Sequence, residues 1–317
     1  MSEGGKNKIK PVLAKPFLKW AGGKRQLLQQ FQHLYPPGLK NKNIKNYYEP
    51  FLGSGAVFFD VVQQFKIENS YLYDVNEELV LVWKVIQQDV HKLLEFLHRY
   101  EKSYLQLDTK QRSEYFYEQR TNFNLQRFNI GYQCYHENWI PRAAQLIFLN
   151  KTCFNGLYRV NSKGEFNTPI GDYSHPTICD ADNLLSVASL LGNATIQYAG
   201  FNTVKKDVLS SSFVYFDPPY RPISKTAVFT SYSKFVFNDR EQIELARIFK
   251  ELDKAGASIM LSNSDPKNII AGDEFFDDLY KDYNIVRVDA SRKINSRADL
   301  RGAIKEIVIT NYKLAPG

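Results

Sequence analysis

The chain has little cysteine and no long apolar run. Its only thiols, Cys134, Cys153 and Cys179, are isolated from one another and from any His cluster. We therefore expect no disulfide framework, no structural zinc site and no other bound metal. No apolar run approaches the length of a membrane span, and the first ten residues lack the apolar core of a signal peptide. These absences favour a reduced, cytoplasmic protein without a membrane partner.

The composition is that of a globular protein with a basic excess. Of the 317 residues, 44% are hydrophobic and 24% are charged, which excludes a disordered chain. Lys and Arg number 41 against 34 Asp and Glu, for a formal charge of +7. This excess favours a polyanionic partner such as nucleic acid, although charge alone does not decide whether the chain binds one.

Strand-like segments alternate with helical ones at both ends of the chain. Continuous or alternating apolar patterns predict strands at 46–50, 70–74, 212–216 and 257–261. Helical periodicity follows at 56–65, 77–88 and 238–254, and the segments 283–288 and 305–311 are expected to form an antiparallel pair. The alternation predicts an α/β fold with a mostly parallel sheet covered on both faces.

Between these blocks the pattern changes. Helical periodicity dominates from residue 89, and residues 151–176 are rich in Asn, Gly, Pro and aromatics. We interpret residues 89–180 as an insertion into one discontinuous α/β domain that is built from residues 1–88 and 181–317.

The most specific motif is Asp217-Pro218-Pro219-Tyr220, directly after an apolar strand. Ligands of open parallel sheets lie beyond the carboxyl ends of the strands. There the Asp217 carboxylate and the Pro218 carbonyl could accept both hydrogens of an aromatic amine, which frees its lone pair for attack. Tyr220 offers a flat face for an extruded base. The alternative is an ordinary Asp-Pro turn beside a packed Tyr.

A glycine turn, Gly53-Ser-Gly55, follows the first expected strand. Glycines here let a ligand approach the backbone, and Asp74, 21 residues after Gly53, could accept from ribose hydroxyls. Phe58 stands where a dinucleotide fingerprint has its third glycine, so S-adenosylmethionine, which has a ribose and no pyrophosphate, fits better than a nicotinamide cofactor. A simple tight turn is the alternative.

Two further segments are weaker when taken singly. Residues 16–24 end in Gly-Gly-Lys but fail the P-loop pattern, and could instead place Trp20 and Lys24 against the methionine part of a cofactor. Residues 154–169 carry Arg159 and Asn161, whose forked side chains suit base edges. A buried Trp beside a turn and an exposed polar hairpin are the respective alternatives.

Together, and in this order, residues 17–24, 154–167 and 217–220 resemble Dam-type DNA adenine-N6 methyltransferases. The resemblance spans about residues 16–312. It implies a Rossmann-like S-adenosylmethionine-dependent methyltransferase sheet with an inserted, mainly helical DNA-recognition domain. It also implies methylation of the adenine N6 amine in double-stranded DNA, most commonly within GATC. Whether a cognate restriction endonuclease acts on the same site stays open.

The resemblance also implies roles for individual residues. The target amine and base would be held by Asp217, Pro218, Pro219 and Tyr220. The cofactor would be bound by Trp20, Ala21, Gly22, Lys24, Phe51, Gly53, Gly55, Asp74, Phe201 and Asp217. DNA would be contacted by Asn155, Leu157, Arg159, Asn161, Pro169, Tyr173, Arg292 and Arg297.

Two positions depart from the family pattern. Gly200 precedes Phe201 where relatives often have Asp, and Asp172 replaces an Arg that could contact phosphate. Residues 221–238, after the catalytic turn, could close over a flipped base, and the basic stretch 291–301 could reach phosphates. A solvated basic loop is the alternative for the latter.

Other functions remain compatible with these residues. Methylation of cytosine N4 or of adenine in RNA would use the same cofactor, and a catalytically silent DNA-binding protein would use none. An Asp217 shut away in an ion pair, with no cavity towards Trp20 and Asp74, would contradict the proposed chemistry.

Overall fold

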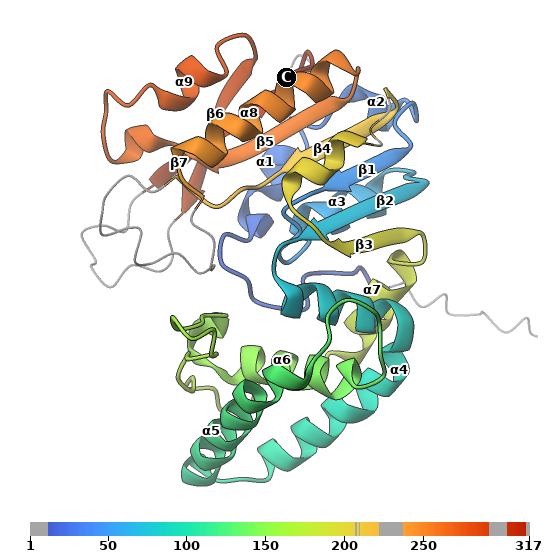
Figure 1. The fold of residues 1–317 in the computed structure, drawn as a ribbon, viewed down its shortest axis with the longest axis vertical. Helices are drawn as coiled ribbons and strands as arrows, with labels where there is room; N and C mark the ends of the chain where they lie inside the picture. Colours follow the sequence, from blue (N-terminus) through green and yellow to red (C-terminus); the bar gives the residue numbers. More distant parts are fainter. Residues whose placement is uncertain (1–11, 207, 209, 222–236, 292–302, 315–317) are drawn as a thin grey trace, which may run out of the picture.

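A single mixed sheet organises the protein. In the computed structural model, which describes residues 12–206, 208, 210–221, 237–291 and 303–314, seven strands lie in the order β3-β2-β1-β4-β5-β7-β6 (Figure 1). The strands are β1 (Asn46–Glu49), β2 (Asn69–Asp74), β3 (Ala194–Tyr198), β4 (Ser212–Phe216), β5 (Ser258–Ser264), β6 (Asn284–Ser291) and β7 (Ala303–Thr310). The first five are parallel, and β7 runs antiparallel to β5 and β6. The expected α/β sheet and its terminal antiparallel pair are confirmed.

Helices follow the strands much as the periodicity predicted. The described helices are η1 (Lys24–Leu27), α1 (Leu28–Phe31), α2 (Pro37–Lys40), α3 (Ala56–Gln64), α4 (Glu77–Leu105), α5 (Thr109–Gln126), η2 (Arg127–Asn129), α6 (Trp139–Thr152), η3 (Phe154–Gly156), α7 (Ala181–Leu190), η4 (Phe201–Lys206), α8 (Asp239–Lys254), η6 (Pro266–Asn268) and α9 (Phe275–Leu279). The predicted α3 and α8 are confirmed almost to the residue. Strand β3 was not predicted, because most of its side chains are exposed and polar.

Alternation along the strands builds a core on each face of the sheet. In β4, Phe213 and Tyr215 belong to the apolar cluster shared with α3 and the inserted helices. Their neighbours Val214 and Phe216 belong to the cluster under α8 and α9. All five residues of β4 are buried, as expected of a central parallel strand.

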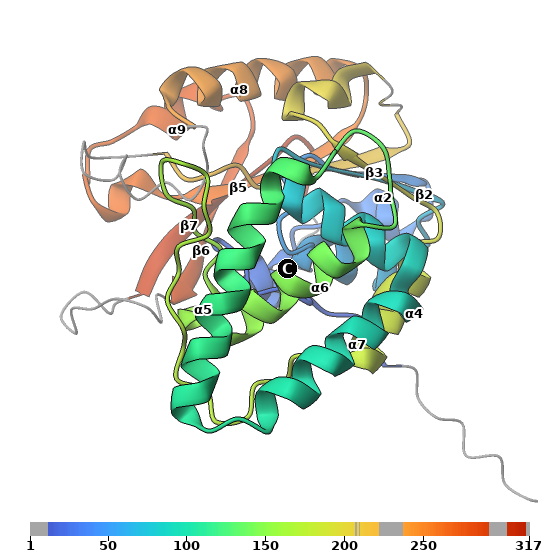
Figure 2. The same ribbon diagram turned by 60° about the horizontal axis from the view of Figure 1, so that its bottom comes forward.

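Helices α5 and α6, which fall within the predicted insertion 89–180, lie with part of α4 at the end of the molecule away from α8 (Figures 1 and 2). Helix α4 is longer than the predicted 77–88, because its periodicity continues to Leu105. Its backbone leaves helical geometry at Asp89, with φ −137° and ψ 40°. This kink coincides with the proposed start of the insertion, but the division of the chain into domains remains a prediction.

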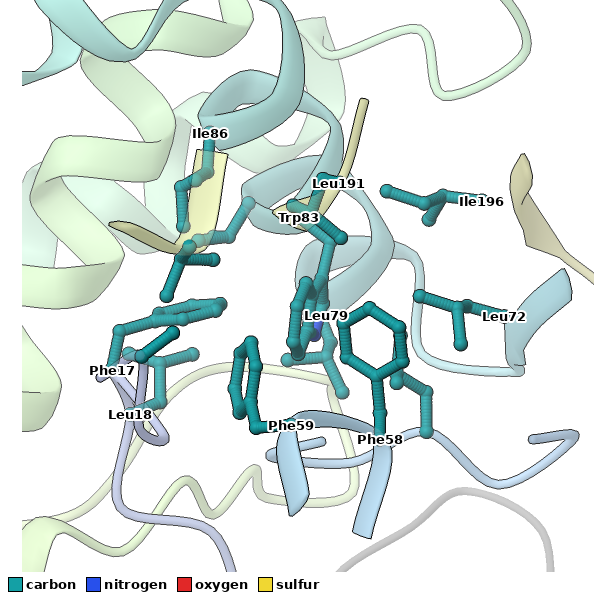
Figure 3. Close-up of a cluster of buried hydrophobic side chains, with 14 of the residues drawn as sticks. Phe17, Leu18, Phe58, Phe59, Leu72, Leu79, Trp83, Ile86, Leu191 and Ile196 are labelled. Atoms are coloured by element: carbon teal, nitrogen blue, oxygen red, sulfur yellow. The ribbon is translucent and has the colours of Figure 1, made fainter. Parts of the chain in front are cut away.

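Trp83 of α4 sits at the centre of the junction between sheet and insertion (Figure 3). Its ring contacts Phe17 at 4.7 Å and Phe59 at 5.5 Å between centroids. Its indole nitrogen donates to the Gly53 carbonyl at 3.2 Å. One fully buried side chain therefore ties the N-terminal segment, α3 and the glycine turn together. Among the described residues no helix combines the length and apolarity needed to cross a lipid bilayer.

Candidate active site

Asp217 lies at the carboxyl tip of β4, where the sequence placed it. Its Oδ1 forms an ion pair with Lys24 Nζ at 2.8 Å and accepts from the Ser262 hydroxyl at 3.2 Å. Both contacts use Oδ1, so neither engages Oδ2. The side chain keeps 19% of its surface exposed. Asp217 is therefore ion-paired, which was one of the conditions named above as contradicting the proposed chemistry, but it is not shut away from solvent.

Lys24 is the buried cation of this site, with 3% of its side chain exposed. Besides Asp217, its Nζ lies 3.4 Å from Glu306 Oε2 and donates to the Tyr220 hydroxyl at 3.1 Å and to the Gly22 carbonyl at 3.2 Å. The sequence had matched Lys24 with the carboxylate of the cofactor. In the structure its partners are protein groups, so pairing with the cofactor stays a prediction that requires Lys24 to share these contacts.

Burial and charge shift the titration of both partners. Desolvation raises the pKa of Asp217 to about 6, although Lys24 and Ser262 work against the shift. Burial alone would lower the pKa of Lys24, but Asp217, Tyr220 and Glu306 outweigh it and raise the pKa above its usual range. At neutral pH the pair is therefore an ionised carboxylate beside a permanent cation.

Sequence reasoning missed two acids that surround this pair. Glu49, at the end of β1, is buried and accepts from the Tyr47 hydroxyl at 2.8 Å; burial raises its pKa well above normal. Glu306, in β7, is buried beside Lys24. The available signal for Glu306 was an acid at an inward-alternating position of the strand-like segment 304–309, which is apolar except for Lys305 and Glu306. A charge at a core position needs a partner, which the sequence did not identify.

The glycine turn holds Asp74 in place. Gly53 N and Asn76 N both donate to the Asp74 carboxylate, each at 2.9 Å. Gly53 and Gly55 have left-handed φ values of 49° and 68°. A Cβ on Gly55 would lie 2.7 Å from the Trp83 ring, so both conformation and space require glycine there.

These groups suit the chemistry of S-adenosylmethionine. The Asp74 carboxylate is fixed by backbone amides and retains lone pairs for hydroxyl groups. A Cβ on Gly53 would lie 3.2 Å from the Trp20 ring, so glycine lets the turn approach this ring closely. Phe51 and Phe201 stack on each other at 5.5 Å, which leaves no room for a third ring between them. An adenine held by these two residues would have to pack outside their stack.

The segment between α6 and α7 is fastened to the N-terminal segment by Asn150. This buried amide accepts from Lys19 N at 2.9 Å, donates to Lys19 O at 2.9 Å and donates to Gly156 O at 2.8 Å. Nearby, Trp20 stacks on Tyr158 with centroids 5.2 Å apart. Two sequence motifs that are more than 130 residues apart thus share one small cluster.

Two predicted base-reading side chains have contacts within their own loop. Arg159 is exposed and donates to Asn167 Oδ1 at 2.8 Å. The Asn161 oxygen accepts from Lys163 N at 2.9 Å and Glu165 N at 3.0 Å, while its amide donates to Glu165 at 2.8 Å. Arg159 therefore remains accessible to a partner, whereas Asn161 shapes the turn.

The remaining predicted DNA contacts fall into two groups. Asn155 has a left-handed backbone, Leu157 is partly buried, Pro169 is exposed, and Tyr173 accepts from Lys19 Nζ at 3.3 Å. Arg292 and Arg297 lie outside the described residues, as does most of 221–238. Within the described ranges, no cluster of three or more His, Cys, Asp or Glu could hold a metal ion.

The chain was compared with known proteins. Residues 20–294 match the family model described as D12 class N6 adenine-specific DNA methyltransferase. A Type II methyltransferase, M.MjaIII of Methanocaldococcus jannaschii, is 47% identical over 94% of this chain and 99% of its own length. M1.LlaDCHI of Lactococcus lactis subsp. cremoris, also a Type II methyltransferase, is 36% identical over 97% and 98%. The DNA adenine methylase of Haemophilus influenzae is 30% identical over 96% of each chain. The chain therefore belongs to the D12 class of N6 adenine-specific DNA methyltransferases.

Proposed function

We propose that this DNA adenine-N6 methyltransferase acts within GATC and holds its target amine between the Asp217 carboxylate and the Pro218 carbonyl. The observation that carries the proposal is the place of Asp217 at the tip of β4, where its side chain is partly exposed and its contacts to Lys24 and Ser262 both use Oδ1. Desolvation raises the pKa of Asp217 to about 6, which favours the carboxylate form at neutral pH. The choice of GATC rests on the likeness of residues 154–169 to Dam-type enzymes.

The residues of the turn divide the work. An exocyclic amine is a weak nucleophile because its lone pair is delocalised into the ring. Two acceptors on its hydrogens favour a tetrahedral nitrogen and make the lone pair available. Pro218 and Pro219 lack N–H donors that would compete for the carboxylate. Tyr220, 39% exposed, offers its ring as a surface for the extruded adenine.

S-adenosylmethionine supplies the methyl group on a positively charged sulfur, so the donor needs no further activation. The chain would bind it at the carboxyl ends of β1 and β2, with Asp74 accepting from the ribose hydroxyls and Trp20 beside the methionine part. Two carboxylates, Asp217 and Glu306, lie beside one buried cation, Lys24. This excess of acids suits a cationic ligand.

Recognition of DNA is assigned to the loop that follows α6. Arg159 is the best-placed reader, because it is exposed and its guanidinium bonds only to one residue of its own loop, Asn167, through the side-chain and backbone oxygens, in the described part of the chain. Asn155, in its left-handed conformation, would enter the duplex as the adenine leaves. Two relatives are named Type II methyltransferases, and we accordingly infer a role beside a restriction endonuclease that acts on the same site, which need not form a complex with this chain. All three cysteines are unpaired, which suits the cytoplasm.

One experiment tests both chemistry and specificity. The purified protein is incubated with S-adenosylmethionine and a random-sequence duplex library, and methylated adenines are mapped by sequencing. We expect N6-methyladenine within GATC, and Asp217→Asn should reduce transfer by at least about a hundredfold, a typical cost of losing one group that stabilises the transition state. Methylation of adenine at another sequence would contradict the proposed GATC specificity but not the proposed chemistry. Near-normal turnover by Asp217→Asn would remove the role of Asp217.

A further inference from the structure

Glu306 occupies an unusual position for a charged residue. In β7 it pairs with Ser264 of β5 and Val288 of β6, in the interior of the sheet. Its side chain shares a face with Val308, which lies in the apolar cluster beneath α3, while Ile307 points to the opposite core. Only 4% of the side chain is exposed. Such a carboxylate is costly to bury unless specific partners compensate.

Its partners are the two residues next to the reactive carboxylate. Glu306 Oε1 accepts from the Tyr220 hydroxyl at 2.6 Å, and Oε2 lies 3.4 Å from Lys24 Nζ. Lys24 in turn donates to the same hydroxyl at 3.1 Å and lies 4.7 Å from the centre of the Tyr220 ring. The hydroxyl of Tyr220 is thus held from both sides, although the ring itself is partly exposed.

We propose that Glu306 is a positioning residue for methyl transfer, which fixes the Tyr220 ring through its hydroxyl and shares Lys24 with Asp217. The inference rests on the proposed function of the turn and adds a residue that contacts neither substrate. Without Glu306, the Tyr220 hydroxyl keeps only its contact with Lys24, so the ring is less firmly held before DNA binds. Asp217 would then be the one carboxylate still paired with Lys24 among the described residues.

The electrostatic part has a separate consequence. Glu306 is one of the charges that raise the pKa of Asp217, whereas Lys24 and Ser262 lower it. Among the residues that the structure describes, Tyr215, Tyr220 and Glu49 also interact electrostatically with Asp217. Removing the charge of Glu306 should therefore lower the pKa of Asp217. A residue with a merely structural role would leave that pKa unchanged.

The test compares Glu306→Gln, Tyr220→Phe and the double variant, with kcat and kcat/KM for an unmethylated duplex measured across pH. Each single variant should lower kcat about tenfold, the scale of one hydrogen bond to a charged group. The double variant should fall little further, because both changes remove the same anchor. In Glu306→Gln, the decrease of kcat/KM on the acidic side of the pH profile should occur at lower pH than in the unsubstituted protein. In Tyr220→Phe, the pH of this decrease should change less.

Glu78→Gln is the matched control. Glu78 is also buried, pairs with a base, Arg142, and accepts from a tyrosine hydroxyl, that of Tyr132, at 2.6 Å, but both partners belong to the predicted insertion. It should lower the melting temperature without changing the pH at which kcat/KM decreases. An unchanged pH of this decrease in Glu306→Gln, or full additivity with Tyr220→Phe, would overturn the inference. If the unsubstituted protein itself transferred no methyl group to adenine, the proposed function would fail instead.

Discussion

At the scale of single residues, the site depends on one lysine shared among acids. Lys24 forms ion pairs with both Asp217 and Glu306, and this shared cation reduces the repulsion between the two buried carboxylates. Sequence reasoning identified Lys24 and Asp217 separately, each from its own motif. It could not identify their contact, because nearly two hundred residues separate them and no local pattern encodes the pairing.

The pH dependence of turnover follows from Asp217. Desolvation raises its pKa to about 6, so below that pH the carboxyl is protonated and no longer a full acceptor for the amine. We expect kcat/KM to be constant at neutral pH and to fall as pH decreases through about 6. The profile should be measured with DNA limiting and cofactor saturating. Recovery of activity after return to neutral pH controls for unfolding, and an unchanged rate at about pH 5 would contradict the assignment.

At the scale of elements, the sequence predicted most of what lies close together along the chain. The strand β4 with its Pro-rich turn, the glycine turn before α3, and helix α8 all carry local signals of periodicity and turn chemistry. Strand β3 escaped because it lies at the edge of the sheet and exposes polar residues. The role of Asn161 as a loop-former could not be separated from base reading, since the same side chain suits both.

The glycine turn depends on a residue outside it. At Gly55 the backbone is left-handed, and an added Cβ would lie 2.7 Å from the Trp83 ring. We expect Gly55→Ala to reduce the free energy of unfolding by roughly 2–3 kcal/mol, from backbone strain and overpacking together. Cofactor affinity should fall as well, because the turn carries Gly53. Urea denaturation and calorimetry would measure the two effects.

Gly272→Ala is the control for that change, since no atom lies within 4 Å of its added Cβ and its φ is not left-handed. It should leave both stability and cofactor binding near their original values. Equal free energies of unfolding for Gly55→Ala and Gly272→Ala would show that the Trp83 side chain can move to accept the added Cβ. The core would then not constrain the turn.

At the scale of the whole molecule, the inserted helices and the sheet share one apolar core. Leu97 of α4 and Ile147 of α6 belong to the same cluster as Phe58, Trp83 and Leu72. The insertion at 89–180 is predicted from a change in sequence pattern, and it stays a prediction. The continuity of its core with the sheet was not predicted, because it depends on how α4 crosses the junction and bends at Asp89.

This shared core makes a prediction for the isolated insertion. A fragment of residues 89–180 would expose the apolar surface that now packs on Trp83 and its neighbours, and would lose the Asn150 bonds to Lys19. We expect it not to fold into a stable unit, unlike an independent domain. Circular dichroism with urea titration would show this, and a cooperative transition in the fragment would contradict it.

The amide of Asn150 bears on how target specificity could be exchanged. Asn150 forms hydrogen bonds with the backbone of Lys19, next to Trp20, and with the backbone of Gly156. In a relative, we expect the loop that corresponds to 154–169 to be matched to that relative's own segment 16–24. In a chimaera that exchanges residues 154–169 alone, the loop would be mismatched with Asn150 and with segment 16–24. A chimaera that exchanges Asn150 and residues 16–24 together with the loop should acquire the DNA recognition sequence of the donor enzyme.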